Sequence, residues 1–283
     1  MNTSDARLHA YRPDLADARL KGEIASPQFV EGRKACIAVP LADLRAAPRP
    51  DSGVNSQLLF GEEVLVFEDA DGWAWVQSQT DGYVGYVSDN TISTHNADAT
   101  HVVTAPRTFV YPGPDLKKPR TAELSMGSLV SVSDFVEARG TLYAVLTSGE
   151  AVIAKHLAPV GDAKDDYVSV AETLLYTPYL WGGASAFGID CSGLVQLSMR
   201  MAGRHVLRDS DMQAASIGEV LDPGAGLKRG DLVFWKGHVS IMTDAKTMIH
   251  ANGHTMDVSR EGLAEAIERI GYLYGQPTGY RRP

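Results

Sequence analysis

One stretch decides the fold of this 283-residue chain: Gly188-Ile189-Asp190-Cys191-Ser192-Gly193-Leu194-Val195-Gln196. From its cysteine onward, five side chains recur at the spacing of one helix face, namely Cys191, Leu194, Val195, Ser198 and Ala202. The first turn of a helix has unpaired N–H groups and a partial positive charge, which favour a thiolate and can donate to an oxyanion. Cys191 is therefore placed to act as a nucleophile, although a free cysteine is also often buried as packing.

Two histidines lie at the ends of apolar runs downstream of this helix. The runs 231–235, 238–242 and 247–250 have the composition of core strands. If the second and third runs pair as an antiparallel hairpin, His238 lies near the end at which His250 finishes. One imidazole can then accept the thiol proton while the other fixes its tautomer and orientation. Taken singly, a histidine in such a position is more often a surface or satisfied core residue.

The remaining pattern of this region predicts an α+β domain. Residues 167–175 have apolar side chains at helical spacing, and Tyr179-Leu180-Trp181-Gly182-Gly183 follows as a turn-rich connector. Helices come first and the strands afterwards, so we expect a mainly antiparallel sheet.

The N-terminal half predicts short strands that repeat. Residues 64–67, 73–76 and 83–87 have β-type composition and are separated by turns, which is typical of a small β-barrel. About 66 positions later the layout recurs, with Gly61 corresponding to Gly127 and Val87 to Ile153. Self-similarity at a fixed period indicates a tandem domain. The second copy lacks the aromatic pattern around Tyr83, so we expect it to be structural.

Composition narrows the function classes. The net charge of −9 argues against sequence-independent binding of nucleic acid, which requires Lys and Arg to neutralise phosphates. No segment approaches the roughly 20 apolar residues that span a bilayer. The N-terminal residues contain neither an apolar core nor a small-residue cleavage site, so we expect a cytoplasmic protein without membrane or nucleic-acid partners. With only Cys36 and Cys191, we expect at least one free thiol.

Several ordered motifs carry a family resemblance. They are Tyr179–Gly183, Gly188–Gln196, Gly230-Asp231-Leu232-Val233-Phe234-Trp235 and Gly237-His238-Val239-Ser240-Ile241. Together they resemble the NlpC/P60 family, whose members have a papain-like core and a Cys-His-His triad. The resemblance assigns the catalytic residues Cys191, His238 and His250, without a cofactor or metal. The upstream repeat resembles bacterial SH3 domains.

The resemblance implies a multidomain fold, in which two small SH3-like β-barrels precede an α+β papain-like NlpC/P60 domain. The expected ranges are 1–35 for an N-terminal arm, 36–97 and 98–160 for the barrels, and 161–283 for the peptidase domain. The whole arrangement resembles γ-D-glutamyl-L-diamino acid endopeptidases, which recycle murein peptides and cut after γ-D-glutamate when the amino-terminal L-Ala is free. A murein-derived peptide is thus the expected partner.

The same resemblance implies a set of substrate-binding residues: Asp190, Ser192, Asp209, Ser210, Tyr83, Glu62 and Trp181. A free substrate amine needs an acidic partner, because an unpaired ammonium is costly to move out of water. Five of these residues also have a structural interpretation. Tyr83 fits a packed barrel aromatic, Glu62 a solvated turn and Trp181 a core residue. Asp190 and Asp209 both fit helix caps.

Three other functions stay open on the sequence alone. The same thiol could perform amidase or acyl-transfer chemistry on another amide. The chain could instead be a binding module for cell-wall peptide with a silent third domain. Finally, Cys191, His238, His250 and Asp190 have the ligand types of a tetrahedral zinc site. The oligomeric state and the preferred diamino acid are not predicted.

Overall fold

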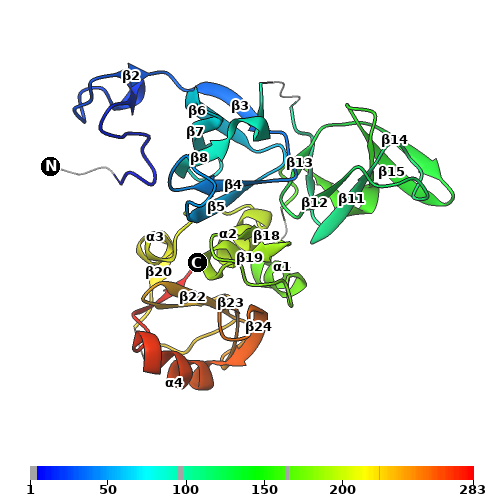
Figure 1. Ribbon diagram of the computed structural model, residues 1–283. Helices are drawn as coiled ribbons and strands as arrows, with labels where there is room; N and C mark the ends of the chain where they lie inside the picture. Colours follow the sequence, from blue (N-terminus) through cyan, green and yellow to red (C-terminus); the bar gives the residue numbers. More distant parts are fainter. Residues whose placement is uncertain (1–4, 95–97, 164–165, 223) are drawn as a thin grey trace. The chain divides into compact units, whose positions relative to one another are not determined.

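Residues 5–94, 98–163, 166–222 and 224–283 are described by the computed structural model shown in Figure 1. The chain divides into two compact units, Met1–Val160 and Gly161–Pro283. The expected boundary between the two repeats involves residue 97, which lies outside the described residues, and the domain limits stay a prediction. Among the described residues, no helix combines the length and the apolar character that crossing a membrane requires.

The second unit is α+β, as the sequence predicts. Its helices are α1 (Tyr167–Thr173), α2 (Cys191–Met201), α3 (Ser210–Ser216) and α4 (Leu263–Tyr274). The six-stranded sheet has the order β20 (Glu219–Val220), β25 (Gly279–Arg282), β21 (Leu232–Trp235), β22 (His238–Met242), β23 (Thr247–Asn252) and β24 (Asp257–Gly262). Every neighbouring pair in it is antiparallel, which confirms the expectation of an antiparallel sheet.

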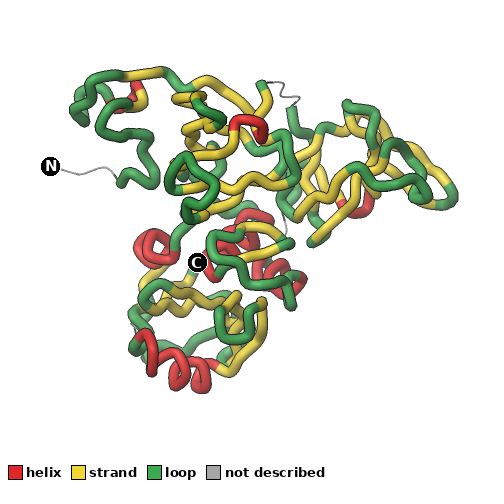
Figure 2. Tube along the Cα trace, viewed as in Figure 1, coloured by secondary structure: helices red, strands yellow, loops and turns green. Residues whose placement is uncertain are grey.

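Helices cover this sheet from two sides. Figures 1 and 2 show α4 on the opposite side of β22 and β23 from α1 and α2. The α4 layer is a buried apolar cluster that joins Ala266 and Ile270 to Val233, Met242 and Met248. Because side chains alternate along a strand, His250 shares a face with Met248, which packs towards α4. The His250 side chain is therefore on the face of the sheet that α4 covers.

A short hairpin leads into α2. Strands β18 (Ala184–Ser185) and β19 (Gly188–Ile189) pair antiparallel immediately before Cys191. The turn approaches the helix closely, because a Cβ on Gly193 would lie 2.4 Å from the carbonyl oxygen of Gly183. Glycine is therefore required at position 193 by the contact itself.

The first repeat forms one seven-stranded antiparallel sheet. Its strand order is β5 (Val54–Leu59), β4 (Leu41–Arg45), β8 (Val84–Ser88), β7 (Trp73–Ser78), β6 (Glu63–Ala70), β3 (Arg33–Ile37) and β9 (Ile92–Ser93). The three strands expected from the sequence are β6, β7 and β8. The expected limit between arm and barrel, after residue 35, falls inside β3.

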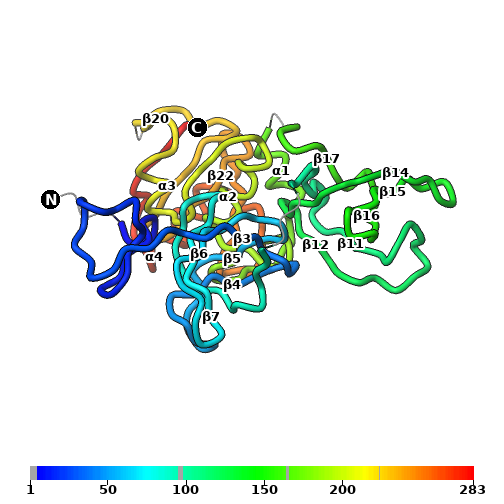
Figure 3. Tube along the Cα trace, turned by 90° about the horizontal axis from the view of Figure 1, so that it is seen from above, coloured from blue at the N-terminus to red at the C-terminus, as the bar shows by residue number. Residues whose placement is uncertain are grey.

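The second repeat forms two sheets. One has the order β12 (Ala122–Ser125), β11 (Arg107–Tyr111), β16 (Ala151–Ile153), β15 (Thr141–Leu146) and β14 (Val132–Ala138), and the other β13 (Leu129–Val130), β10 (His101–Val103) and β17 (Leu157–Pro159). The five-stranded order repeats that of β5, β4, β8, β7 and β6. Strands β14 and β15 lie side by side in both views (Figures 1 and 3).

A shared irregularity supports the repeat. The register slips between Val66 and Glu68 in the β6–β7 pair, and between Val132 and Asp134 in the β14–β15 pair. Both slips fall at the offset of 66 residues that the sequence indicates. Pairings among the described residues leave the sheets of both repeats open, so closure into two barrels stays a prediction.

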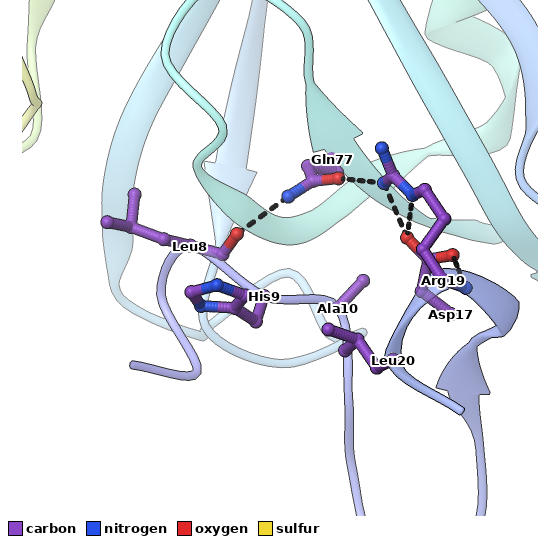
Figure 4. A pocket seen from close by; sticks show the side chains of 7 residues that line it. All are labelled: Leu8, His9, Ala10, Asp17, Arg19, Leu20 and Gln77. Carbon is purple, nitrogen blue, oxygen red and sulfur yellow. Dashed lines mark hydrogen bonds and ion pairs between the residues drawn. The ribbon is translucent and has the colours of Figure 1, made fainter. Parts of the chain in front are cut away.

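The N-terminal arm packs on the first repeat. Figure 4 shows Gln77 between two arm residues, donating from Nε2 to the Leu8 carbonyl at 2.7 Å and accepting at Oε1 from Arg19 at 2.7 Å. Ala10 and Leu15 join Phe67 and Trp75 in a buried cluster. A cavity of about 250 Å³ lies beside these contacts, between the arm and Gln77 of the sheet. We interpret it as incomplete packing where the arm is anchored.

We expect Gly61→Ala to destabilise the first unit more than Gly72→Ala. Both glycines have φ of +81°, but a Cβ on Gly61 would lie 2.4 Å from the Leu129 carbonyl oxygen, whereas one on Gly72 meets nothing within 4 Å. The left-handed backbone costs alanine about 1 kcal/mol at either site, and the clash adds about 2 kcal/mol at Gly61. Urea unfolding of both variants measures the difference, and equal losses would contradict this account.

Candidate active site

The thiol of Cys191 lies at the start of α2, beneath the beginning of β22. Helix α2 starts at Cys191 itself, with Asp190 as its N-cap, so the predicted position in the first turn is confirmed. Cys191 is buried and its Sγ lies 4.0 Å from the carbonyl oxygen of Gly237, the residue before His238. The structure therefore brings together two segments that are 46 residues apart.

The two predicted histidines meet. His238 Nε2 lies 2.9 Å from His250 Nδ1, and the rings cross at 65° with centroids 5.2 Å apart. Strands β22 and β23 form the expected antiparallel hairpin, with Ile241 opposite Ile249. Because Nε2 of His238 is hydrogen-bonded to His250, its other ring nitrogen, Nδ1, is available to accept a proton. The geometry thus fits one base and one orienting imidazole.

Burial disfavours the charged forms of Cys191 and His238. It raises the pKa of the Cys191 thiol to about 12, with Asp190 adding to the rise. It also lowers the pKa of His238 to about 3, with smaller contributions from His250 and Arg269. Burial therefore disfavours both the thiolate and the imidazolium. For the thiol, this effect opposes the expected preference for a thiolate at the helix N-terminus.

Asp190 is held by a buried arginine. Its carboxylate accepts hydrogen bonds from the backbone N–H groups of Gly182 and Gly193, from the Ser192 hydroxyl and from both terminal nitrogens of Arg208. Arg208 is only 1% exposed and also donates to Ser192 Oγ and to the carbonyl of Gly183. Five donors occupy the acceptor capacity of one carboxylate. The helix-cap interpretation of Asp190 is therefore confirmed.

The other expected substrate residues of the second unit surround this cluster. Ser192 is buried beside Asp190, and Asp209 and Ser210 are half-buried at the start of α3. Asp209 occupies the N-cap position of α3 without a capping hydrogen bond from its side chain. Trp181 is 73% exposed, so its interpretation as a core residue is wrong. Their substrate-binding roles stay predictions.

Two further expected residues belong to the first unit. Tyr83 is buried, as a packed aromatic would be. Glu62 is also buried, and its Oε2 accepts from the backbone N–H of Leu59 at 3.0 Å, so the solvated-turn interpretation is wrong. Cys36 lies in this unit as well, and neither Cys36 nor Cys191 is part of a disulfide.

Three residues near the triad were missed by the sequence analysis. Tyr179 lies near the thiol, and its pKa is raised by burial and by the charges of Cys191 and Asp190. Glu261 Oε2 lies 3.2 Å from His250 Nε2, and Arg269 pairs with the same carboxylate. Tyr179 stood in a quoted motif, but nothing in the spacing of Glu261 and Arg269 pointed to His250.

Metal binding was one open alternative. Within the described parts of the chain, no group of three or more His, Cys, Asp and Glu side chains is arranged to hold a metal ion. Asp190, one of the four proposed ligands, is bound by Arg208 instead.

Comparison with known proteins identifies the family to which the chain belongs. The bacterial dipeptidyl-peptidase SH3 domain model matches residues 44–92, and the NlpC/P60 family model matches residues 176–268. The chain is 30% identical to γ-D-glutamyl-L-lysine dipeptidyl-peptidase of Bacillus subtilis over 240 residues, which cover 77% of this chain and 78% of that protein. This chain belongs to the NlpC/P60 family of cysteine peptidases. It has an SH3-like domain ahead of the peptidase domain.

Two further similarities run along most of the NlpC/P60 chain. It is 26% identical to dipeptidyl-peptidase 6 of Lysinibacillus sphaericus over 272 residues, covering 85% of this chain and 99% of that one. A crystal structure of an NlpC/P60 family protein from Bacillus cereus superposes with a TM-score of 0.73 at 23% identity, covering 88% of this chain and 99% of the other. The second similarity supports the fold. The SH3 domain model matches only the first repeat.

We expect Arg208→Met to destabilise the peptidase domain strongly. The variant leaves the Asp190 carboxylate buried without its ionic partner, which costs about 3 kcal/mol or more. Urea unfolding measures this loss, and Arg120→Met is the matched control because its ion pair with Glu123 is exposed. A free energy of unfolding as high as that of the control variant would contradict the structural role of Arg208.

We expect His238 to make stability depend on pH between about 6.5 and 3. Its pKa falls from an ordinary 6.5 to about 3 in the folded state, so the unfolded chain binds the extra proton in that range. Folding stability is thus lost as the pH drops from about 6.5 and is unaffected near pH 8. His238→Asn removes this titration, so the variant should gain relative to wild type as the pH falls. Parallel stability curves from urea unfolding at pH 4 to 8 would disprove it.

Proposed function

We propose that the protein hydrolyses the bond between γ-D-glutamate and the diamino acid in murein peptides that carry a free amino-terminal L-Ala. The observation that carries this proposal is the hydrogen bond between His238 and His250 beside the buried Cys191 thiol. The relatives named γ-D-glutamyl-L-lysine dipeptidyl-peptidase support the bond that is cut.

In the first half of the reaction, Cys191 Sγ attacks the γ-carbonyl carbon of D-glutamate. His238 Nδ1 accepts the thiol proton as the carbon–sulfur bond forms, because burial disfavours a resting thiolate. N–H groups at the start of α2 stabilise the oxyanion. The intermediate then expels the diamino acid, whose amine takes the proton from His238. A thioester of the L-Ala-D-Glu unit remains on Cys191.

In the second half, water replaces the amine. His238 removes a proton from the water as its oxygen attacks the thioester carbonyl, and the proton passes to the departing sulfur. The products are L-Ala-D-Glu, with a free γ-carboxylate, and the regenerated thiol. His250 orients His238 through both halves.

We propose Glu62 and Asp209 as partners of the substrate amine. Asp190 was also a candidate, but its five hydrogen bonds favour a role in holding the nucleophile's turn. Ser192 and Ser210 supply hydroxyls to the peptide, while Trp181 and Tyr83 supply apolar walls. An acidic site at the amino end would reject acylated peptides, because their amide carries no charge to pair.

A requirement for a free amine suits fragments already released from the wall. We propose recycling of such fragments in the cytoplasm as the setting for this activity. For the second repeat we propose a second SH3-like domain with a structural role, which its matching strand order and bulge support.

The direct test is cleavage of L-Ala-γ-D-Glu-meso-diaminopimelate, followed by mass spectrometry of the products. Wild type should release L-Ala-D-Glu, and Cys191→Ala should release none. N-acetylation of the L-Ala should slow the reaction by about 100-fold, the loss expected when an ion pair of about 3 kcal/mol is removed.

Three outcomes would count against the proposal. Equal product from wild type and Cys191→Ala would remove Cys191 as the nucleophile. Equal rates on the acetylated and free peptides would remove the amine requirement. Transfer of the L-Ala-D-Glu group to an added amine in preference to water would favour the acyltransferase alternative.

A further inference from the structure

An ion pair lies directly behind His250. Glu261 of β24 receives Arg269 of α4 through both carboxylate oxygens, with Nε at 2.9 Å from Oε1 and a terminal nitrogen at 2.5 Å from Oε2. Glu261 Oε2 lies 3.2 Å from His250 Nε2. One carboxylate oxygen therefore faces both the guanidinium and the ring.

The fold brings these groups to one face of the sheet. Met248 is opposite Glu261, and His250 is opposite Ser259, so Glu261 is a diagonal neighbour of His250. Helix α4 covers the same face, which is how Arg269 reaches the carboxylate. The His250 side chain is 1% exposed, while the side chain of Glu261 is 21% exposed.

Apart from Glu261, no group in the described chain is placed to bind His250 Nε2. Its Nε2 is buried and has no partner in full hydrogen-bond geometry among the described residues, although Glu261 lies at ion-pair distance. A carboxylate can only accept, so its presence favours a proton on Nε2. In the neutral ring that proton leaves Nδ1 as an acceptor.

The tautomer of His250 dictates that of His238. If His250 Nδ1 accepts, the atom 2.9 Å away, His238 Nε2, must carry the proton. His238 Nδ1 then has a free lone pair for the thiol proton. If the proton of His250 were on its Nδ1 instead, His250 would donate the hydrogen bond and His238 Nε2 would accept it. The only proton of a neutral His238 would then be on its own Nδ1. The base would then be blocked.

We propose that Glu261, held in place by Arg269, is a positioning residue that keeps the proton of His250 on Nε2 and thereby keeps His238 in its base form. This deepens the proposed function and rests on it for the identity of the base. Glu261 on β24 and Arg269 on α4 thus form a relay that supports the triad through His250.

Arg269 has a second effect in this arrangement. Its guanidinium offsets the charge of the carboxylate beside the buried ring. The ionisable groups next to His238 include His250, Glu261 and Arg269, and the latter two form an ion pair. The carboxylate thus orients the proton of His250 as part of a nearly neutral pair.

The first test reads the tautomers directly. Long-range ¹⁵N–¹H correlation spectra at pH 8 on the full chain should show both His238 and His250 protonated on Nε2. Glu261→Gln should shift His250 towards the Nδ1-protonated form, because Arg269 retains the amide oxygen and turns the amide NH₂ towards His250. A wild-type His250 protonated on Nδ1 would overturn the proposal without any variant.

The second test is kinetic. Glu261→Gln should lower kcat on the tripeptide by about 10- to 100-fold, with KM changed less than about twofold, since in this proposal Glu261 acts through His250. Glu172→Gln is the matched control, because Glu172 is also a partly exposed carboxylate paired with arginines in the same unit. The control should keep wild-type kcat.

A third readout needs no substrate, so it separates failure of the relay from failure of the proposed function. Iodoacetamide should alkylate Cys191 more slowly by a similar factor in Glu261→Gln than in Glu172→Gln, with the modified residue identified by peptide mapping. Unchanged tautomers, or an unchanged alkylation rate, would overturn the relay. An uncleaved tripeptide together with the expected tautomers and alkylation would count against the proposed substrate alone.

Discussion

The buried pair of Asp190 and Arg208 is the interaction on which the catalytic site depends. It joins the N-terminal turn of α2 to the hairpin before it and to the chain that leads into α3, because Asp190 accepts from Gly182 and Gly193 while Arg208 donates to Gly183. A buried ion pair is costly unless every donor and acceptor is satisfied. Here five hydrogen bonds satisfy the carboxylate, and the position of Cys191 is the result.

Burial explains the electrostatics of the same site. The turn that places Cys191 also removes it from water, and burial disfavours the charged forms of the thiol and of His238. A neutral pair avoids the desolvation cost of a buried thiolate and imidazolium in the resting enzyme. In the proposed mechanism, proton transfer and attack occur together, so the orientation and tautomer of His238 matter more than a preformed charge.

The elements of the peptidase domain could be predicted because their patterns are local. Helix α2 has its N-cap, Asp190, directly before the eleven residues that carry its apolar face, and the hairpin of β22 and β23 follows from neighbouring apolar runs. The partners of these elements could not be predicted. Arg208 is 18 residues from Asp190, and Arg269 reaches Glu261 only because α4 folds back over β24. Ion pairs between side chains of different helices and strands produce no periodic pattern in the sequence.

The N-terminal half shows the same division. The 66-residue period correctly indicated two copies of one strand order, and even the bulges at Val66 and Val132 recur. The packing of the arm through Gln77 and Trp75 had no such signal, since it depends on single contacts between distant segments. Tyr83 is buried as a packed aromatic would be, whereas Glu62 is buried although its place in a turn indicated a solvated carboxylate.

The central claim is that Cys191 forms a covalent acyl intermediate. Rapid acid quenching of the enzyme during turnover of L-Ala-γ-D-Glu-meso-diaminopimelate, followed by intact-mass measurement and peptide mapping, tests it most directly. The account predicts an added L-Ala-D-Glu acyl group on the peptide that contains Cys191, absent from His238→Asn. Product formation with no adduct, or with the adduct on Cys36, would contradict it.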